Sequence, residues 1–509
     1  MLPTLVGWLL RALLVAFGVA AAAALVRWVA AARGERREPW PVRLSLLMLL
    51  LAGVYAIGHA RLLVARAELE EGQLRYARYG DPRRAEQNRA EVRGWILDCT
   101  GEDDNALARY AATSRGIERT YPLGEAGANL IGGGKDAEQR DYTVERLFAA
   151  RLREAASWSE LGEPHPAGRD LRLTLCAAPT RTAARLLHGA ERPGAVVVQD
   201  VATGALVDYA ATGAAEQAPM GIKRYAPPGS VWKLALAALW WERGLPDEPL
   251  PCPASIEVTP RATISNYGGV GRGTLSGPAE MLVFSCNTAA VRMALQMRER
   301  LGGDAFVAAY RRFGFAPYAA GDAPSADSTF WRSDSRAWEE RMSPPPARIR
   351  ISDETGPAEW AQLAIGQGPV DVTPIAVSRF VQAIGNGGVM LPPTLEAPLA
   401  ARPPDGQRIM SGATARKLQA AMLGTVERGT AKSVGPKLAG VPGALGGKTG
   451  TAQVRGARDD GWFAGLVFDA AGRPRYTVVV YLRGGGPGGS APAAIAAGMV
   501  RELLTAPPA

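Results

Sequence analysis

Two apolar runs near the N-terminus approach the length needed to cross a membrane. Residues 13–26 (LLVAFGVAAAAALV) and 44–60 (LSLLMLLLAGVYAIGHA) are almost free of charge, and arginines flank both. A spanning helix needs roughly 17 to 25 mostly apolar residues, which each run approaches once its flanks are included. A cleaved signal peptide is the alternative for the first run, but no small-x-small cleavage site precedes the polar sequence. We expect two transmembrane helices.

The loop between these runs indicates their orientation. Residues 27–43 contain five arginines against two glutamates. Basic loops stay in the cytoplasm, so the chain beyond the second run is expected outside the membrane. We therefore assign residues 1–64 to a membrane anchor with a short basic cytoplasmic loop.

The C-terminal two thirds of the chain alternate between strand and helix patterns. Residues 171–189 read as a strand followed by an amphipathic helix, and residues 194–211 read as a hairpin around a VATGA turn. Residues 461–469 and 475–485 are further strands, and residues 491–504 are helical. This order predicts an α+β fold, in which helices flank an antiparallel sheet.

The segments around this core have weaker patterns. Residues 65–89 are charged and helix-prone, like a stalk, and VRGWILDCTGE (residues 92–102) reads as a strand and a turn. We expect a stalk and a small mixed domain over 65–170, followed by one domain over 171–509. Residues 318–356, rich in Pro, Ser, Asp and Trp, are expected to form an irregular insertion.

Composition narrows the possible partners. The net charge is +9, but the arginines are scattered and aromatic residues make up only 7% of the chain, so we expect no nucleic-acid partner. The four cysteines, Cys99, Cys176, Cys252 and Cys286, have no metal-ligand spacing. We expect single buried thiols, although an oxidising compartment would allow three full disulfide pairings. No metal or cofactor is expected.

Only seven of the 58 basic residues are lysines, and one of them, Lys233, follows a serine in PPGSVWK. Arginine stays protonated, whereas a neutral lysine accepts a proton from a nearby hydroxyl. Ser230 and Lys233 would share one helix face at i and i+3. Burial and nearby positive charge would lower the lysine pKa toward the working range. A chance SxxK arises roughly a quarter of the time, so this pair is weak evidence alone.

Two further motifs follow in the chain. Ser285-Cys286-Asn287 suits a proton relay with an amide contact, although Ser and Asn are also common helix N-caps. Lys448-Thr449-Gly450-Thr451 lies in a predicted strand, where Gly450 permits close substrate approach. The GGKTGT sequence is similar to a phosphate loop, but Pro442 replaces its first glycine. The three motifs in this order have a chance probability well below about one in a hundred.

These motifs, SVWK, SCN and KTGT, resemble the SxxK, SxN and KTG motifs of the serine penicillin-recognising family. GQGPVDVTPIAVSRFVQAIGNGGVMLPPTL (Gly366 to Leu395), GTAKSV and WFAGLVF resemble segments of its transpeptidases, over about residues 170 to 505. RGWILD and RTYPLGEAGANLIG resemble the pedestal of the monofunctional, class B penicillin-binding proteins. Cys99-Thr100 and Cys176 depart from the residues usual in that family at those positions.

The resemblance implies a penicillin-binding transpeptidase fold and a serine D,D-transpeptidase activity on peptidoglycan stem peptides. Ser230 would attack the penultimate D-alanine of a stem ending in D-Ala-D-Ala, with Lys233 as the base. Ser285 would carry a proton toward the leaving amine, and Asn287 would hold Lys233 and a substrate amide. β-Lactams would acylate Ser230 as mimics of that terminus.

The third motif would bind the end of the substrate. Lys448 would supply positive charge, Thr449 and Thr451 would bind the terminal carboxylate with Gly450 between them, and backbone amides of Ser230 and Thr451 would form the oxyanion hole. A β-lactamase or D,D-carboxypeptidase, and a non-catalytic β-lactam sensor or scaffold, are the alternatives. The resemblance further implies a location at the bacterial inner membrane with a periplasmic catalytic domain, and a membrane-embedded SEDS-type glycosyltransferase as partner.

Overall fold

The computed structural model describes residues 93–153 and 169–505 with short gaps, together with residues 53, 56–59 and 61. The gaps are 114–115, 129, 134–141, 213–218, 316–329, 344–346, 353 and 403. The predicted membrane run 13–26, most of the run 44–60 and the predicted stalk 65–89 lie outside the described residues. Within the part of the chain that is described, no helix is long and apolar enough to cross a membrane.

The chain divides into two compact units. The smaller unit comprises residues 1–94, 109–119 and 151–170, and the larger comprises residues 95–108, 120–150 and 171–509. In the smaller unit, β2 (Arg109–Thr113) pairs with β3 (Gly116–Thr120). The domain boundary expected at residue 170 stays a prediction.

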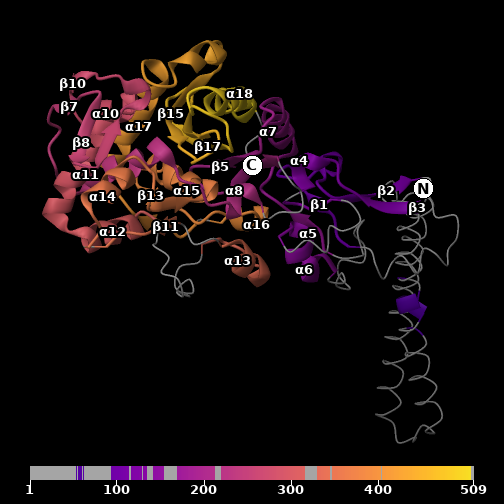
Figure 1. Cartoon of the computed structure of the whole chain (residues 1–509). Coiled ribbons are helices and arrows are strands. Elements are labelled where there is room, and N and C mark those ends of the chain that lie inside the picture. The colour runs from indigo at the N-terminus through magenta and orange to yellow at the C-terminus, as the bar shows by residue number, and fades with distance from the viewer. Residues whose placement is uncertain are drawn as a thin grey trace, which may run out of the picture. The chain divides into compact units, whose positions relative to one another are not determined.

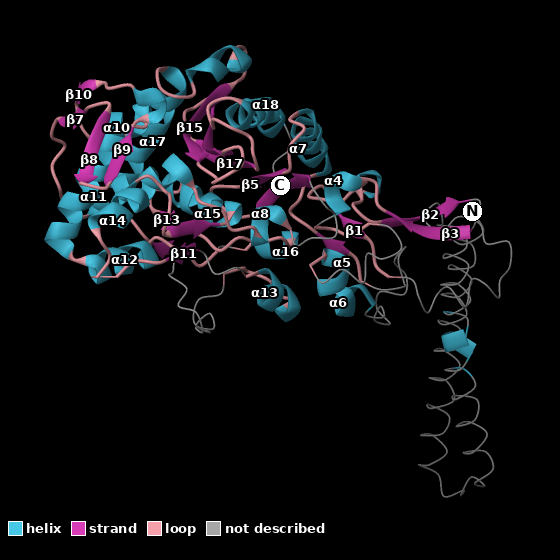
Figure 2. Cartoon of the chain, in the orientation of Figure 1, coloured by secondary structure: helices cyan, strands magenta, loops and turns pink. Residues whose placement is uncertain are grey.

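The larger unit contains a five-stranded antiparallel sheet. Its order is β15 (Gly443–Ala452), β16 (Asp460–Asp469), β17 (Pro474–Leu482), β5 (Gly194–Gln199) and β6 (Leu206–Thr212). Figures 1 and 2 label three of its strands, β15, β17 and β5. The predicted hairpin over 194–211 and the two predicted C-terminal strands are confirmed. The first and last parts of the domain therefore meet in one sheet.

Both faces of this sheet are buried, which explains why its strands are almost continuously apolar. Along β17, Val478 and Val480 pack in a cluster with residues of α7 (Ala177–Gly189) and α18 (Ala491–Thr505). The intervening Val479 and Tyr481 pack in a second cluster, which includes residues of α15 (Pro374–Gly385). Alternate side chains thus contact different helices, as the two-residue period of a strand requires.

A second, helical region adjoins β15. Its central helix, α9 (Lys233–Glu242), is buried from Lys233 to Trp241, because apolar residues occupy every side of it. The neighbouring helices are α10 (Pro278–Phe284), α11 (Asn287–Leu301), α12 (Gly303–Arg312), α14 (Pro357–Ala364) and α17 (Gly412–Glu427). These helices carry or surround two of the three sequence motifs.

Short elements complete the described part of the chain. The two-stranded pairs are β1 (Ile96–Leu97) with β4 (Leu171–Arg172), β7 (Leu250–Cys252) with β10 (Gly273–Leu275), β8 (Ser255–Thr259) with β9 (Ala262–Ser265), β11 (Ala347–Ile349) with β12 (Val370–Val372), and β13 (Val389–Met390) with β14 (Gln407–Arg408). The short helices are α4 (Glu125–Ala128), α5 (Val144–Leu147), α6 (Ala149–Arg153), α8 (Met220–Lys223), α13 (Arg336–Met342) and α16 (Ala397–Ala400). The single-turn 3-10 helices are η1 (Asp103–Asn105), η2 (Gly229–Trp232) and η3 (Tyr267–Gly269), and η4 (Lys432–Leu438) is a longer one. The insertion expected to be irregular thus contains α13 and β11, and the fully buried Trp338 anchors α13.

The expectation of single buried thiols is wrong. Cys99 is bonded to Cys176, and Cys252 is bonded to Cys286. The spacing of the cysteines selects no pairing, and only the fold shows which cysteines meet. The positions Cys99 and Cys176, which both depart from the family pattern, are therefore partners of one bond.

Candidate active site

Ser230 lies in the 3-10 turn η2, and Lys233 begins α9 directly after it. The helix predicted for this motif thus starts with a tighter turn. Gly229 has φ +53, and a Cβ on it would lie 2.4 Å from the carbonyl oxygen of Thr451. Gly450 is equally confined, since its Cβ would lie 2.7 Å from the carbonyl oxygen of Pro228. The two glycines let the turn that carries Ser230 pack directly on β15.

Lys233 is completely buried and connects the first motif with the second. Its Nζ donates to the backbone oxygen of Ser285 at 2.7 Å and to Oδ1 of Asn287 at 2.6 Å. Burial lowers the pKa of Lys233 well below its usual value, and the charge of Lys448 lowers it further. A buried amine with a lowered pKa, three residues after Ser230 in the chain, is the kind of group that accepts a proton from a serine.

Ser285 lies between α10 and α11, with a left-handed backbone conformation at φ +56. Such a conformation is uncommon for a residue other than glycine and is typical of functional turns. Lys448 Nζ donates to the Ser285 hydroxyl at 2.8 Å and to the backbone oxygen of Thr449 at 2.9 Å. Lys233 Nζ is 3.5 Å from the same hydroxyl, so Ser285 Oγ lies between two amines. Burial lowers the pKa of Lys448 to about 7.

The strand β15 presents the third motif. The hydroxyl groups of Thr449 and Thr430 are 2.7 Å apart. The Thr451 hydroxyl accepts from the backbone amide of Gly488 at 3.4 Å, and its carbonyl accepts from Gln367 Nε2 at 3.4 Å. Both threonines thus have polar neighbours that orient them.

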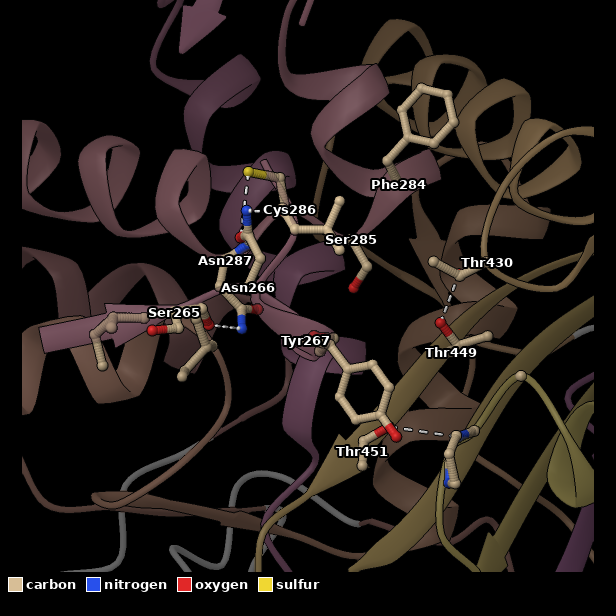
Figure 3. Close-up of a pocket in the computed structure, with 18 of the residues that line it drawn as sticks. Ser265, Asn266, Tyr267, Phe284, Ser285, Cys286, Asn287, Thr430, Thr449 and Thr451 are labelled. Atoms are coloured by element: carbon tan, nitrogen blue, oxygen red, sulfur yellow. Dashed lines mark hydrogen bonds between the residues drawn. The ribbon is translucent and has the colours of Figure 1, made fainter. Parts of the chain in front are cut away.

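An open cleft of about 730 Å³ brings most of the predicted residues together. Figure 3 shows Ser285 and Asn287 on one side of it, and Thr449 and Thr451 on the other. The predicted residues that line the cleft are Ser230, Ser285, Asn287, Thr449 and Thr451. Three more complete the predicted set: Lys233 and Lys448, which are fully buried, and Gly450 of β15, which packs on the turn before Ser230.

Other residues of the cleft were not singled out from the sequence. Tyr267 is 69% exposed at the cleft, next to Asn266, which lies at the end of β9. Neither belongs to a recognisable motif, so the sequence carries no signal for them. Thr430 and Gln367 lie in the GTAKSV and GQG segments, so the resemblance already pointed to their neighbourhoods.

Comparison with known proteins gives concordant results. Residues 194–504 match the model of the penicillin binding protein transpeptidase domain. Penicillin-binding protein PbpB of Mycobacterium tuberculosis is 30% identical over 283 residues, which cover 50% of this chain and 37% of that protein. Peptidoglycan D,D-transpeptidase PbpA of the same species is 28% identical over 318 residues, covering 55% of this chain and 56% of that protein. The matched residues therefore span at most a little more than half the length of these two relatives.

Solved structures share the fold. A ceftriaxone acyl-enzyme complex of penicillin-binding protein A from M. tuberculosis has a TM-score of 0.65 at 22% identity, covering 82% of this chain and all of that one. PBP2 of Pseudomonas aeruginosa, in complex with WCK 5153, has a TM-score of 0.61 at 23% identity, covering 82% of this chain and 96% of that one. With a family model that matches most of its length, this chain belongs to the penicillin-binding protein transpeptidase domain family.

Proposed function

We propose that the chain is a serine D,D-transpeptidase that cross-links peptidoglycan through an acyl-enzyme on Ser230. The observation that carries the proposal is the buried amine of Lys233, which bonds to Asn287 and Ser285 and has a lowered pKa. A lysine in a purely structural role is usually exposed and charged. A buried, readily deprotonated lysine three residues after a serine in an open cleft suits nucleophile activation.

Acylation begins when Lys233 accepts the proton of Ser230. The Ser230 oxygen attacks the carbonyl carbon of the penultimate D-alanine, and the backbone amides of Ser230 and Thr451 stabilise the oxyanion, each donor contributing about 3 to 4 kcal/mol. The hydroxyl of Ser285, between the two lysine amines, gives its proton to the nitrogen of the leaving D-alanine and regains one from Lys233, which returns to its neutral form. An amine from a second stem peptide then attacks the ester and restores Ser230.

The C-terminal carboxylate of the donor stem binds at β15. Thr449 and Thr451 donate hydrogen bonds to it, and Lys448 provides positive charge beneath them while it stays protonated. Asn287 offers its side chain to a substrate amide. The same contacts serve the carboxylate of a β-lactam, which is why β-lactams are expected to acylate Ser230.

Hydrolytic activity is the second candidate. A β-lactamase or carboxypeptidase needs a group that activates water against the ester, for which a glutamate is the usual choice in class A β-lactamases. Among the described residues that line the cleft, the only carboxylate is that of Asp459. This composition favours an acyl-enzyme that persists until an amine arrives. A non-catalytic sensor or scaffold would not need a buried lysine with a lowered pKa.

The test uses a pentapeptide stem ending in D-Ala-D-Ala with a D-amino acid as acceptor, followed by mass spectrometry. The full chain should form the exchanged pentapeptide faster than the hydrolysed tetrapeptide. Ser230→Ala should abolish both products. Ser490→Ala, at a cleft serine whose hydroxyl bonds within its own turn, should leave both unchanged. Tetrapeptide alone would identify a hydrolase, and no product from either route would contradict the proposal.

The setting of this enzyme is part of the proposal. Residues 1–64 anchor it in the bacterial inner membrane with residues 65–170 as stalk and pedestal, so that the catalytic part is periplasmic. The two disulfides support this location, because disulfides persist in oxidising compartments. Blocking free thiols in whole cells before denaturation and reduction should reveal four protected cysteines. A SEDS-type glycosyltransferase is the proposed membrane partner, and cross-linking from residues 65–94 in cells should capture it.

A further inference from the structure

The first turn of α11, which carries Asn287, is capped by a residue from a distant loop. The backbone amides of Asn287 and Thr288 donate to Oδ1 of Asn266 at 2.8 and 3.2 Å. The first amides of a helix have no partner within the helix and normally bond to a residue just before it. Cys286, the residue just before the helix, accepts from the Ala289 amide through its Sγ at 3.3 Å, and Asn266 supplies the acceptor for the two amides that precede it. The loop therefore helps to hold the first turn of α11 in place.

Asn266 is itself fixed on its other side. Its Nδ2 donates to the backbone oxygens of Pro253 at 2.8 Å and Val270 at 3.0 Å, and the side chain is nearly buried. The amide oxygen faces two donors while the amide nitrogen faces two acceptors. Turning the amide over would place its oxygen against the two acceptors and its nitrogen against the two donors. These hydrogen bonds therefore fix the Asn266 side chain in one orientation between its own loop and α11.

The link reaches the catalytic lysine through Asn287. The Asn287 side chain donates to the backbone oxygen of Ser265 at 2.8 Å, and its Oδ1 accepts from Lys233 at 2.6 Å. The loop around Asn266 therefore holds both the backbone and the side chain of the residue that orients the Lys233 amine (Figure 3). A displacement of Asn287 would move that amine relative to Ser230.

A covalent bond joins the same two segments. Cys286, between Ser285 and Asn287, is bonded to Cys252, and Cys252 immediately precedes the Pro253 that accepts from Asn266. The left-handed turn at Ser285 is strained and needs support from its surroundings. The disulfide and the Asn266 amide provide that support from one side of the turn.

We propose that Asn266 is a positioning residue for the SxN turn, and that the Cys252–Cys286 disulfide is the covalent half of the same support. Together they hold Asn287, and through it Lys233, in the arrangement that activates Ser230. The inference rests on the proposed acyl transfer at Ser230. The inference extends that proposal. It makes the acylation rate depend on the side chain of Asn266, which does not touch the substrate, and on the redox state of the Cys252–Cys286 disulfide.

The test measures the second-order rate constant of acylation of the full chain by a fluorescent penicillin, and the melting temperature of each variant. Asn266→Ala should reduce the rate at least about tenfold, since small displacements of catalytic groups have large effects. Asn266→Asp keeps an oxygen for the two helix amides but loses both Nδ2 bonds. It should lose as much thermal stability as Asn266→Ala yet keep more of the rate.

A matched control separates positioning from general destabilisation. Asn386→Ala removes an amide that donates to the backbone oxygen of Val389 within its own turn. It should lower the melting temperature while leaving the rate unchanged. Equal rates for wild type and Asn266→Ala, or rates that follow the melting temperature across all three variants, would overturn the inference. Failure of the wild type itself to become acylated would instead overturn the proposed function.

A second experiment tests the Cys252–Cys286 disulfide by treating the folded protein with a reducing agent and measuring the acylation rate. Reduction should slow acylation of the wild type and of a Cys99→Ser, Cys176→Ser variant, which keeps only the disulfide beside the site. It should have no effect on Cys252→Ser, Cys286→Ser, which should start at the lowered rate. If that variant is acylated as fast as the oxidised wild type, the disulfide has no positioning role.

Discussion

Replacing Lys448 with methionine should flatten the dependence of stability on pH. Burial lowers the pKa of Lys448 from 10.5 to about 7 in the folded protein. Because the unfolded chain then binds more protons between these two values, stability rises with pH through this window and is lowest below pH 7. With about 1.4 kcal/mol per pKa unit, the lysine lowers the free energy of unfolding at pH 7 by about 4 kcal/mol relative to pH 10.5.

The assay compares free energies of unfolding at pH 7 and pH 10 by guanidinium denaturation of the full chain. The change in the free energy of unfolding between the two pH values is measured for the wild type and for Lys448→Met, and the second value is subtracted from the first. The difference cancels the pH dependence of the other groups, apart from Lys233, whose pKa the charge of Lys448 also lowers. Both contributions act in the same direction. Lys437→Met, at an exposed lysine, should retain the wild-type dependence. An equally steep dependence in Lys448→Met would refute the reasoning that burial neutralises this amine.

Three further results are expected. Replacing Cys99 and Cys176 with serine should lower the free energy of unfolding by about 4 kcal/mol, because the bond closes a loop over a separation of 77 residues, and denaturation would measure it. Gly229→Ala should abolish penicillin labelling, because a Cβ would lie 2.4 Å from the Thr451 oxygen in a left-handed conformation; labelling at the wild-type rate would contradict the close packing. The acylation rate should rise with pH as Lys233 loses its proton and fall again as Lys448, whose pKa is about 7, loses the charge that binds the carboxylate, which a rate profile from pH 5 to 10 would check.

The sequence predicted the parts of the structure that depend on local pattern. The strands β16 and β17 are continuous apolar runs separated by a short polar turn, and the hairpin of β5 and β6 surrounds a recognisable turn. The three motifs combine residue types that chemistry requires together, and the structure brings residues of all three to one cleft. The proximity of Lys448 to Ser285, which are 163 positions apart, was expected only through family resemblance.

Other features depend on contacts between distant segments, and pattern alone does not show these. The pairing of Cys252 with Cys286 follows from the approach of β7 to the start of α11, for which their sequence has no signal. Asn266 looks like an ordinary loop residue, and only the two hydrogen bonds that its Oδ1 accepts from Asn287 and Thr288 show that it caps another helix. The helix α13 was missed because its residues are mainly charged, while one buried tryptophan anchors it.

Mass spectrometry of the β-lactam adduct tests the central claim most directly. After incubation with a penicillin, the intact full chain should gain the mass of one opened β-lactam, and peptide mapping should place it on Ser230. Ser230→Ala should gain none, and Lys233→Met should react roughly 10²- to 10⁴-fold more slowly, the usual contribution of a general base. An adduct on another residue, or equally fast acylation of Lys233→Met, would contradict the assignment of Ser230 as nucleophile and Lys233 as its base.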